Sequence, residues 1–172
     1  MAHLNNEKIR RINKVIGDLN MQQDSDFPET SIIDVAESLG VSLKTAKFKE
    51  DNIAGLIDYG EEGKGAIIFV NESNNEKKRN FTIAHEIAHL LLHPNNGARF
   101  KVDRHDFQNL KTKNVMEEEA DYFAAELLAP EHKIKEIMFK SKMQEWDLVN
   151  FCSAYFNVSK SVISNRLKWI NT

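Results

Sequence analysis

The sequence predicts an α+β fold made of two helices, a small three-stranded sheet and then a series of helices. Apolar residues recur every three or four positions near both ends of the chain, which is typical of amphipathic helices. Between residues 41 and 71, three short segments alternate or are rich in β-branched residues, which is typical of strands. The 172 residues are enough for one domain with a small helical appendage.

Composition indicates a globular protein of the cytoplasm. Hydrophobic residues make up 41% of the chain and charged residues 28%, and no apolar run is long enough to cross a membrane. The first residues show no signal-peptide pattern, and the single cysteine, Cys152, excludes an intrachain disulfide. The net charge of −3 argues against a protein that coats nucleic acid.

The N-terminal elements follow from periodicity and turn residues. Residues 5–20 predict a helix because their apolar side chains share one face. A polar link over 21–30 separates this helix from a second one at 31–39, which Gly40 is placed to end in the left-handed conformation. The expected strands are 41–48, 53–60 and 65–71.

The second half is predicted to be mainly helical. After a polar loop over 71–80, residues 81–93 take up helical periodicity. Residues 95–114 are polar and are expected to form a connecting loop. The next helix, 115–130, carries one apolar line, and two or three further helices are expected over 131–170.

The stretch FTIAHEIAHLLLH, residues 81–93, carries the strongest chemical signal. On a helix, His85 and His89 lie one turn apart on one face, which suits two ligands of a single divalent metal. Glu86 lies about 100° round the helix from His85, where its carboxylate can take a proton from a water that the metal has acidified. Such a water can attack an amide. The alternative is a polar stripe on an otherwise apolar helix.

A catalytic zinc usually has a third protein ligand. The segment EEEADYF offers Glu117, Glu118 and Glu119 on the next predicted helix. Glu117 and Asp121 are four residues apart, so they share a face on which Glu117 can bind the metal. Asp121 can then accept the far N–H of a ligand histidine and fix its tautomer. The competing interpretation is that all three glutamates are solvated at a helix N-terminus, where negative charge is favoured.

Other polar residues have less defined roles. His93 lies about 80° round the helix from His85, so a capping or ligand-orienting role suits it better than metal binding. Peptide hydrolysis also needs a donor that stabilises the tetrahedral oxyanion. The candidates for that donor are His105, His132, Tyr122 and Tyr155, among which the sequence does not choose.

The motifs RNFTIAHEIAHLLLH and EEEADYFAAELLAP, with AESLGV and AIIFVNES upstream, together resemble the ImmA/IrrE family of bacterial and phage metallopeptidases. The resemblance implies a zincin-like metallopeptidase domain, which we place at residues 1–135 with its N-terminal helices. It also implies a role for each matching residue. These are His85, His89 and Glu117 as metal ligands, Glu86 as the catalytic glutamate, and Asp121 in the place where many members have Asn.

The same resemblance implies a regulatory function. Members of the family are typically regulatory proteases, and they are often encoded beside a helix-turn-helix repressor of the Xre type. They cleave or inactivate this repressor to switch on prophage, other mobile-element or stress genes. Some of these pairs are discussed as toxin–antitoxin modules.

The C-terminal segment, residues 136–172, has a helix-turn-helix-like pattern. Residues 133–172 hold seven Lys/Arg against three Asp/Glu, a balance of +4. The residues placed to contact DNA or a partner protein are Lys160, Asn165, Arg166 and Lys168. Many helix pairs share this spacing without touching DNA, so direct DNA binding is not favoured, and docking of a repressor is at least as well supported.

The sequence therefore predicts a metal-dependent intracellular endopeptidase. One divalent ion is expected, zinc in preference, although the ligand set does not exclude manganese. The expected substrate is a protein, namely a helix-turn-helix repressor or antitoxin, and no membrane is involved. The alternatives are a DNA-binding regulator whose metal site is structural or sensory, and a module that sequesters a repressor without cutting it.

Overall fold

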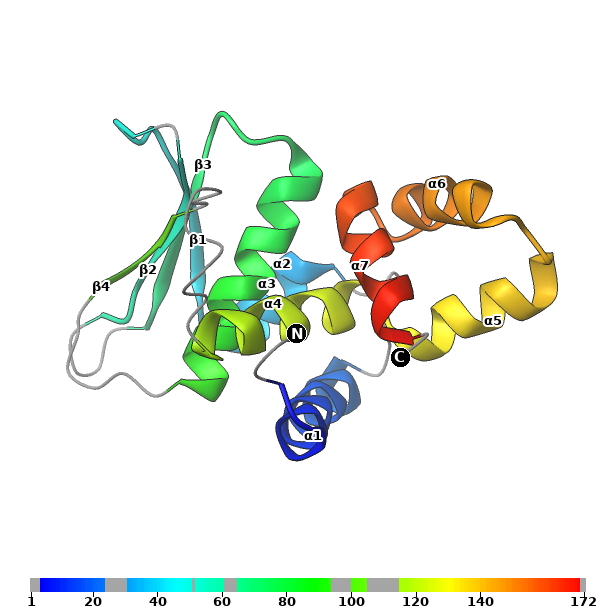
Figure 1. Cartoon of the computed structure of the whole chain (residues 1–172). Coiled ribbons are helices and arrows are strands. Elements are labelled where there is room, and N and C mark those ends of the chain that lie inside the picture. The colour runs from blue at the N-terminus through cyan, green and yellow to red at the C-terminus, as the bar shows by residue number, and fades with distance from the viewer. Residues whose placement is uncertain are drawn as a thin grey trace.

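The computed structural model describes residues 4–23, 31–50, 52–60, 65–93, 100–104 and 115–170. A sheet stands at one end of the molecule with α3 packed against it, and α5, α6 and α7 gather at the other end (Figure 1). The elements, in chain order, are α1 Asn6–Gln23, α2 Ile32–Ser38, β1 Ser42–Ala46, β2 Ile53–Asp58, β3 Ile67–Asn71, α3 Glu76–Leu92, β4 Phe100–Arg104, α4 Val115–Leu128, α5 Glu131–Ser141, α6 Glu145–Tyr155 and α7 Lys160–Ile170. The predicted α+β class is confirmed.

The sheet has four strands in the order β1-β3-β2-β4. β1 is parallel to β3, and β2 is antiparallel to both of its neighbours. All three predicted strands are present, but β4 lies within 95–114, which we expected to be a loop, so the prediction was one strand short. In sequence, β4 is FKVDR. The charged residues between its apolar ones suit a short edge strand but hide it among polar neighbours.

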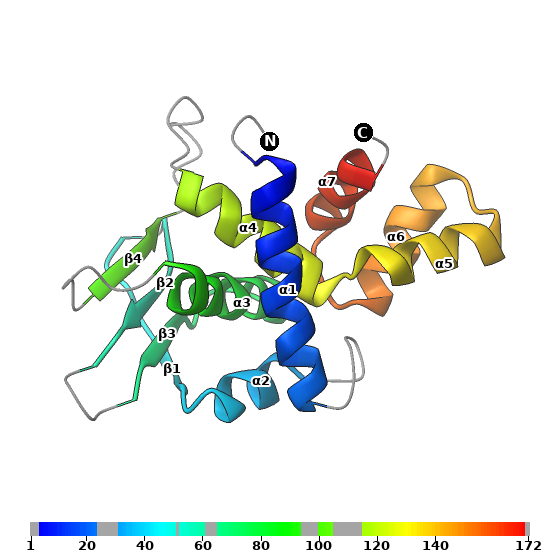
Figure 2. The ribbon, with the colours of Figure 1, turned by 90° about the horizontal axis from the view of Figure 1, so that it is seen from below.

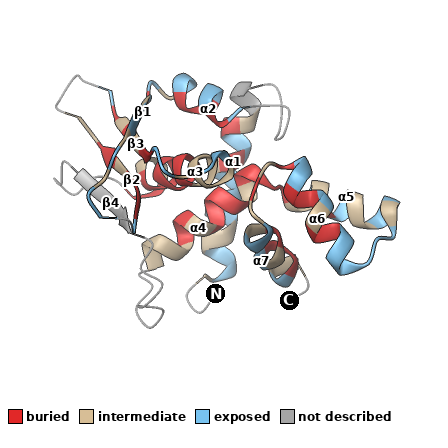
Figure 3. Ribbon diagram, turned by 90° about the horizontal axis from the view of Figure 1, so that it is seen from above, coloured by how far each residue is buried: buried red, intermediate tan, exposed pale blue. Residues whose placement is uncertain are grey.

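Helix α3 begins five residues before its predicted start at Phe81, at Glu76. The reason is a capping interaction, because the Asn75 side chain accepts a hydrogen bond from the Lys78 backbone N–H at 3.0 Å. The prediction of a loop through residue 80 was therefore wrong at its C-terminal end. α3 lies between the sheet and α4, and the buried residues of both helices concentrate where they meet (Figure 3).

Helix α1 lies across α4 and contributes to the same core (Figure 2). Its predicted apolar face is confirmed, because Ile12, Ile16 and Leu19 are buried. The turn after α2 also follows the prediction, since Gly40 adopts a φ of 70° and so ends the helix in the left-handed conformation.

The C-terminal helices α6 and α7 pack against each other around a shared apolar core. Four apolar residues of this core are buried, namely Phe156, Val158, Ile163 and Leu167. Two polar contacts tie α6 and its following turn to the start of α3. Lys77 Nζ donates to the Ser153 carbonyl at 2.8 Å, and Asn157 Nδ2 donates to Glu76 Oε1 at 2.9 Å. Among the described helices, none is both long and apolar enough to cross a membrane.

Candidate metal centre

Three predicted ligand atoms converge between α3 and α4. His85 Nε2 lies 3.0 Å from His89 Nε2 and 3.1 Å from Glu117 Oε2. His89 Nε2 lies 3.5 Å from the same carboxylate oxygen. Both histidines are buried, whereas the Glu117 side chain is one-third exposed. The group is therefore closed on the α3 side and reachable from solvent beside Glu117.

The donor set and its spacing fit a divalent ion. Tetrahedral zinc at about 2.0–2.1 Å from its nitrogen and oxygen ligands separates those ligands by about 3.3 Å. The three separations of 3.0, 3.1 and 3.5 Å are close to that value. Two imidazole nitrogens and a carboxylate oxygen facing one another also concentrate lone pairs, an arrangement that a cation stabilises.

Asp121 lies behind His85, one turn along α4 from Glu117. Its Oδ1 is 3.1 Å from His85 Nδ1. In the tautomer that carries its proton on Nδ1, His85 donates to this carboxylate, and its Nε2 lone pair points at the other two ligand atoms. The i, i+4 spacing that placed Glu117 and Asp121 on one face thus brings them to the two nitrogens of a single imidazole.

Glu86 is fully buried on the side of α3 that faces the sheet. Its neighbour across this interface is Gly55 in β2, where a Cβ atom would lie 3.9 Å from Glu86 Oε1 and only 2.4 Å from Thr82 Cγ2. The missing side chain at Gly55 therefore lets α3 approach β2 closely enough to enclose the Glu86 carboxylate. Burial of this kind suits a group that must exchange protons in a water-poor site.

Tyr59, directly after β2, lies near enough to Glu86 and Glu117 to feel their charges, and the sequence did not reveal this. It is half-buried, and burial together with the charges of Glu86 and Glu117 raises the pKa of its hydroxyl. Tyr59 is therefore a protonated hydrogen-bond donor at neutral pH, within electrostatic reach of both carboxylates. Only its position at the end of a strand packed on α3 could have indicated this, because no motif includes it.

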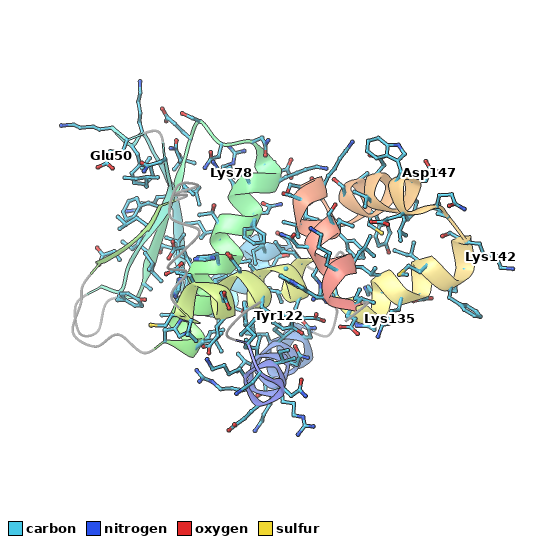
Figure 4. The ribbon with its side chains drawn as sticks, viewed as in Figure 1. Glu50, Lys78, Tyr122, Lys135, Lys142 and Asp147 are labelled. Carbon is cyan, nitrogen blue, oxygen red and sulfur yellow. The ribbon has the colours of Figure 1, made fainter. Side chains whose placement is uncertain are left out.

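The residues named in advance as oxyanion donors lie elsewhere or outside the described residues. Tyr122 is buried against Trp169, with ring centroids 5.5 Å apart, on the side of α4 that faces α1 (Figure 4). Tyr155 is stacked on Phe151 at the exposed surface of α6. His132 is exposed on α5, and His105 lies outside the described residues.

A second row of polar groups continues from His89 away from the ligand atoms. His89 Nδ1 lies 2.8 Å from His93 Nδ1, and His93 Nε2 lies 2.9 Å from Glu119 Oε2. Lys8 Nζ of α1 lies 3.2 Å from Glu119 Oε1. Burial alone would raise the pKa of Glu119, but its contacts with His93 and Lys8 outweigh burial and lower it. Glu119 is buried, so the interpretation that all three glutamates are solvated at the helix N-terminus is excluded.

The predicted contact residues of α7 divide into two groups. Lys160, Asn165 and Lys168 are exposed. Arg166 is fully buried, so its assignment as a contact to DNA or a partner was wrong. Its Nε donates to the Ala129 carbonyl at 3.3 Å, and its guanidinium pairs with Glu126. Arg166 therefore holds α7 against the end of α4, which is a structural role.

Helices α5 and α6 each expose a large aromatic side chain. Phe139 is 85% exposed and Trp146 is 69% exposed. A groove of about 410 Å³ is lined by residues of both helices, among them Phe151 and Tyr155 together with Lys133, Glu136 and Lys140. Large exposed aromatic side chains of this kind are typical of surfaces that contact other proteins.

The class of protein that this arrangement fits is a metal-dependent peptidase, with two histidines one turn apart, a buried glutamate next to one of them and a carboxylate from a second helix. Comparison with known families agrees with that class. The IrrE N-terminal-like domain of the peptidase M78 family matches residues 36–168, which is 133 of the 172 residues. The chain belongs to this family, and the resemblance to ImmA/IrrE proteins is thereby confirmed. A search of curated proteins found no match.

Proposed function

We propose that the protein is a zinc-dependent intracellular endopeptidase in which His85, His89 and Glu117 hold the ion. Membership of a peptidase family supports hydrolysis of peptide bonds. The observation that carries the proposal is the convergence of the three ligand atoms to within 3.5 Å of one another. Zinc bound there would polarise the substrate carbonyl and acidify a water.

The surrounding residues supply the proton transfers and the orientation. Glu86 takes the proton of the attacking water and later passes it to the leaving amine. Asp121 accepts the Nδ1–H of His85 and so fixes the tautomer that exposes Nε2. The Tyr59 hydroxyl donates a hydrogen bond to the oxyanion that develops on the substrate carbonyl.

The sheet offers a place for the substrate backbone. β4 forms an edge of the sheet, on the side where α4 begins and carries Glu117 (Figure 2). An extended peptide can add to such an edge by backbone hydrogen bonds. We propose that the substrate lies along β4, with its scissile bond near the three ligands.

We further propose that the substrate is a helix-turn-helix repressor or antitoxin. The family resemblance supports a repressor, and two observations favour a protein over DNA as the partner of the C-terminal helices. Arg166, the one arginine expected to contact DNA, is buried. The exposed aromatic side chains of Phe139 and Trp146 suit a protein surface better than a phosphate backbone.

The decisive experiment compares the wild type with Glu86→Gln, both loaded with zinc. Each protein is mixed with a repressor encoded beside it, and fragments are sought by mass spectrometry. We expect Glu86→Gln to keep the metal and the fold but to lose cleavage. Cleavage at the wild-type rate by metal-loaded Glu86→Gln would exclude the mechanism. Intact repressor in a stable complex with the wild type would favour sequestration instead.

A further inference from the structure

We infer that His93, Glu119 and Lys8 are positioning residues for the metal ligand His89, so that helix α1 is part of the support of the metal site. The inference rests on the proposed metal site. It assigns a role to a buried polar row that peptide hydrolysis itself does not use.

The row has one consistent direction of hydrogen bonding. For Nε2 of His89 to bind a metal, its proton must sit on Nδ1, which lies 2.8 Å from His93 Nδ1. His93 then accepts at Nδ1 and carries its own proton on Nε2, which lies 2.9 Å from Glu119 Oε2. Each histidine is neutral, and the chain of donors ends on a carboxylate. His93 thus holds one ligand histidine as Asp121 holds the other.

Lys8 compensates the charge at the end of this row. The Glu119 side chain is only 8% exposed, and a carboxylate at such a depth needs a cation or hydrogen-bond donors close by. Lys8 Nζ, at 3.2 Å and on a side chain that is 30% exposed, supplies the positive charge. Without Lys8, the unpaired carboxylate would be better hydrated if it turned toward solvent, away from His93.

Helix α1 is fastened to the same region at a second point. Arg11 donates to the backbone carbonyl of Leu92, the last residue of α3, which directly precedes His93. α1 therefore contacts both the end of the histidine helix and the carboxylate behind it. Residues of α1 lie before the matched range 36–168, so this support comes from a part of the chain that the family match does not include.

Zinc affinity of the full chain tests the inference, measured by competition with a chromophoric chelator. His93→Leu removes both hydrogen bonds and should weaken zinc binding about 10–100-fold. His93→Gln keeps one acceptor and one donor and should recover part of that loss. Lys8→Met should weaken binding about three- to tenfold, and Lys8→Arg should restore it. Lys14→Met, an exposed lysine on the same helix, is the matched control and should bind as the wild type.

Melting of the metal-free proteins separates positioning from simple stabilisation. If the Lys8–Glu119 pair were purely structural, Lys8→Met would lower the melting temperature and leave the zinc affinity of the folded protein unchanged. Zinc affinities of Lys8→Met and His93→Leu equal to the wild type would therefore overturn this inference alone. Failure of the wild type to bind zinc would instead overturn the proposed function, and the inference with it. Lys8 is partly exposed, so its variants are expected to fold even where His93→Leu does not.

Discussion

Asp121 Oδ1 lies 3.1 Å from His85 Nδ1, while His85 Nε2 lies 3.1 Å from Glu117 Oε2, so two carboxylates of one helix meet the two nitrogens of one imidazole. Only one of the carboxylates can share a metal with His85. In the proposed site Glu117 shares the metal, and we propose that Asp121 acts through the orientation of the ring.

Replacement of Asp121 should therefore weaken zinc binding without abolishing it. We expect Asp121→Ala to lose about 10–100-fold in affinity, because the ring of His85 is then free to rotate and to change tautomer. Asp121→Asn keeps an acceptor oxygen and should lose less. Zinc titration of both variants checks this, and an Asp121→Ala protein that binds zinc like the wild type would contradict it.

The contact of Gly55 with α3 predicts a large effect for a single methyl group. Gly55→Ala places a Cβ 2.4 Å from Thr82 Cγ2 and 3.0 Å from the Phe69 carbonyl oxygen, so the contact between α3 and β2 must readjust. We expect a loss of about 1–3 kcal/mol in the free energy of unfolding and reduced cleavage, because Glu86 moves with the helix. Gly17→Ala is the control. A Cβ there meets nothing within 4 Å, and alanine should stabilise α1 by about 0.5–1 kcal/mol.

The buried Arg166 predicts a fold defect where DNA binding would predict a binding defect. Arg166→Met leaves Glu126 without its cation and should destabilise the protein by about 3–5 kcal/mol in urea unfolding. Lys168→Met changes an exposed lysine on the same helix and should leave stability within about 0.5 kcal/mol of the wild type. Equal stability of the two variants would be inconsistent with the observed packing.

The position of Tyr59 predicts a catalytic effect with little effect on the metal. Tyr59→Phe keeps the ring but removes the donor, and kcat should fall about 10²–10³-fold while KM and zinc affinity stay near wild-type values. The measurement is steady-state cleavage of the identified substrate. A change confined to KM would assign Tyr59 to substrate binding instead.

Cys152 predicts a loss of stability in alkali. Burial raises the pKa of its thiol to about 11, from an ordinary value near 9. The unfolded chain therefore releases the proton first, and the stability that this thiol contributes below about pH 9 is lost as the pH rises toward 11. Urea unfolding across this range should show a steeper decline for the wild type than for Cys152→Ala. Parallel declines would exclude a contribution from this thiol.

The convergence of the proposed ligand residues could be predicted because their spacing is local. His85 and His89 share a helix face, as do Glu117 and Asp121, and the period of the helix alone places each pair. What helical spacing could not reveal is which elements those faces meet. The contact of Lys8 with Glu119 joins α1 to α4 across the packed core, and no pattern around either residue marks it.

The errors have a common physical origin. Arg166 and Lys168 look alike as cationic residues on a terminal helix, and only the packing of α7 on α4 decides that one is buried and the other exposed. β4 was missed for a similar reason. Its five residues become a strand by pairing with β2, a partner that lies more than forty residues away in the chain.

The position of α1 also separates two meanings of the word domain. Similarity begins at residue 36, yet Ile12, Ile16 and Leu19 are buried in the common core. Burying three such side chains contributes about 5–9 kcal/mol, comparable to the whole stability of many proteins. A chain trimmed to residues 36–168 would thus match the family without being able to fold by itself. If such a fragment were inactive in an assay, the result would say nothing about the chemistry of the full chain.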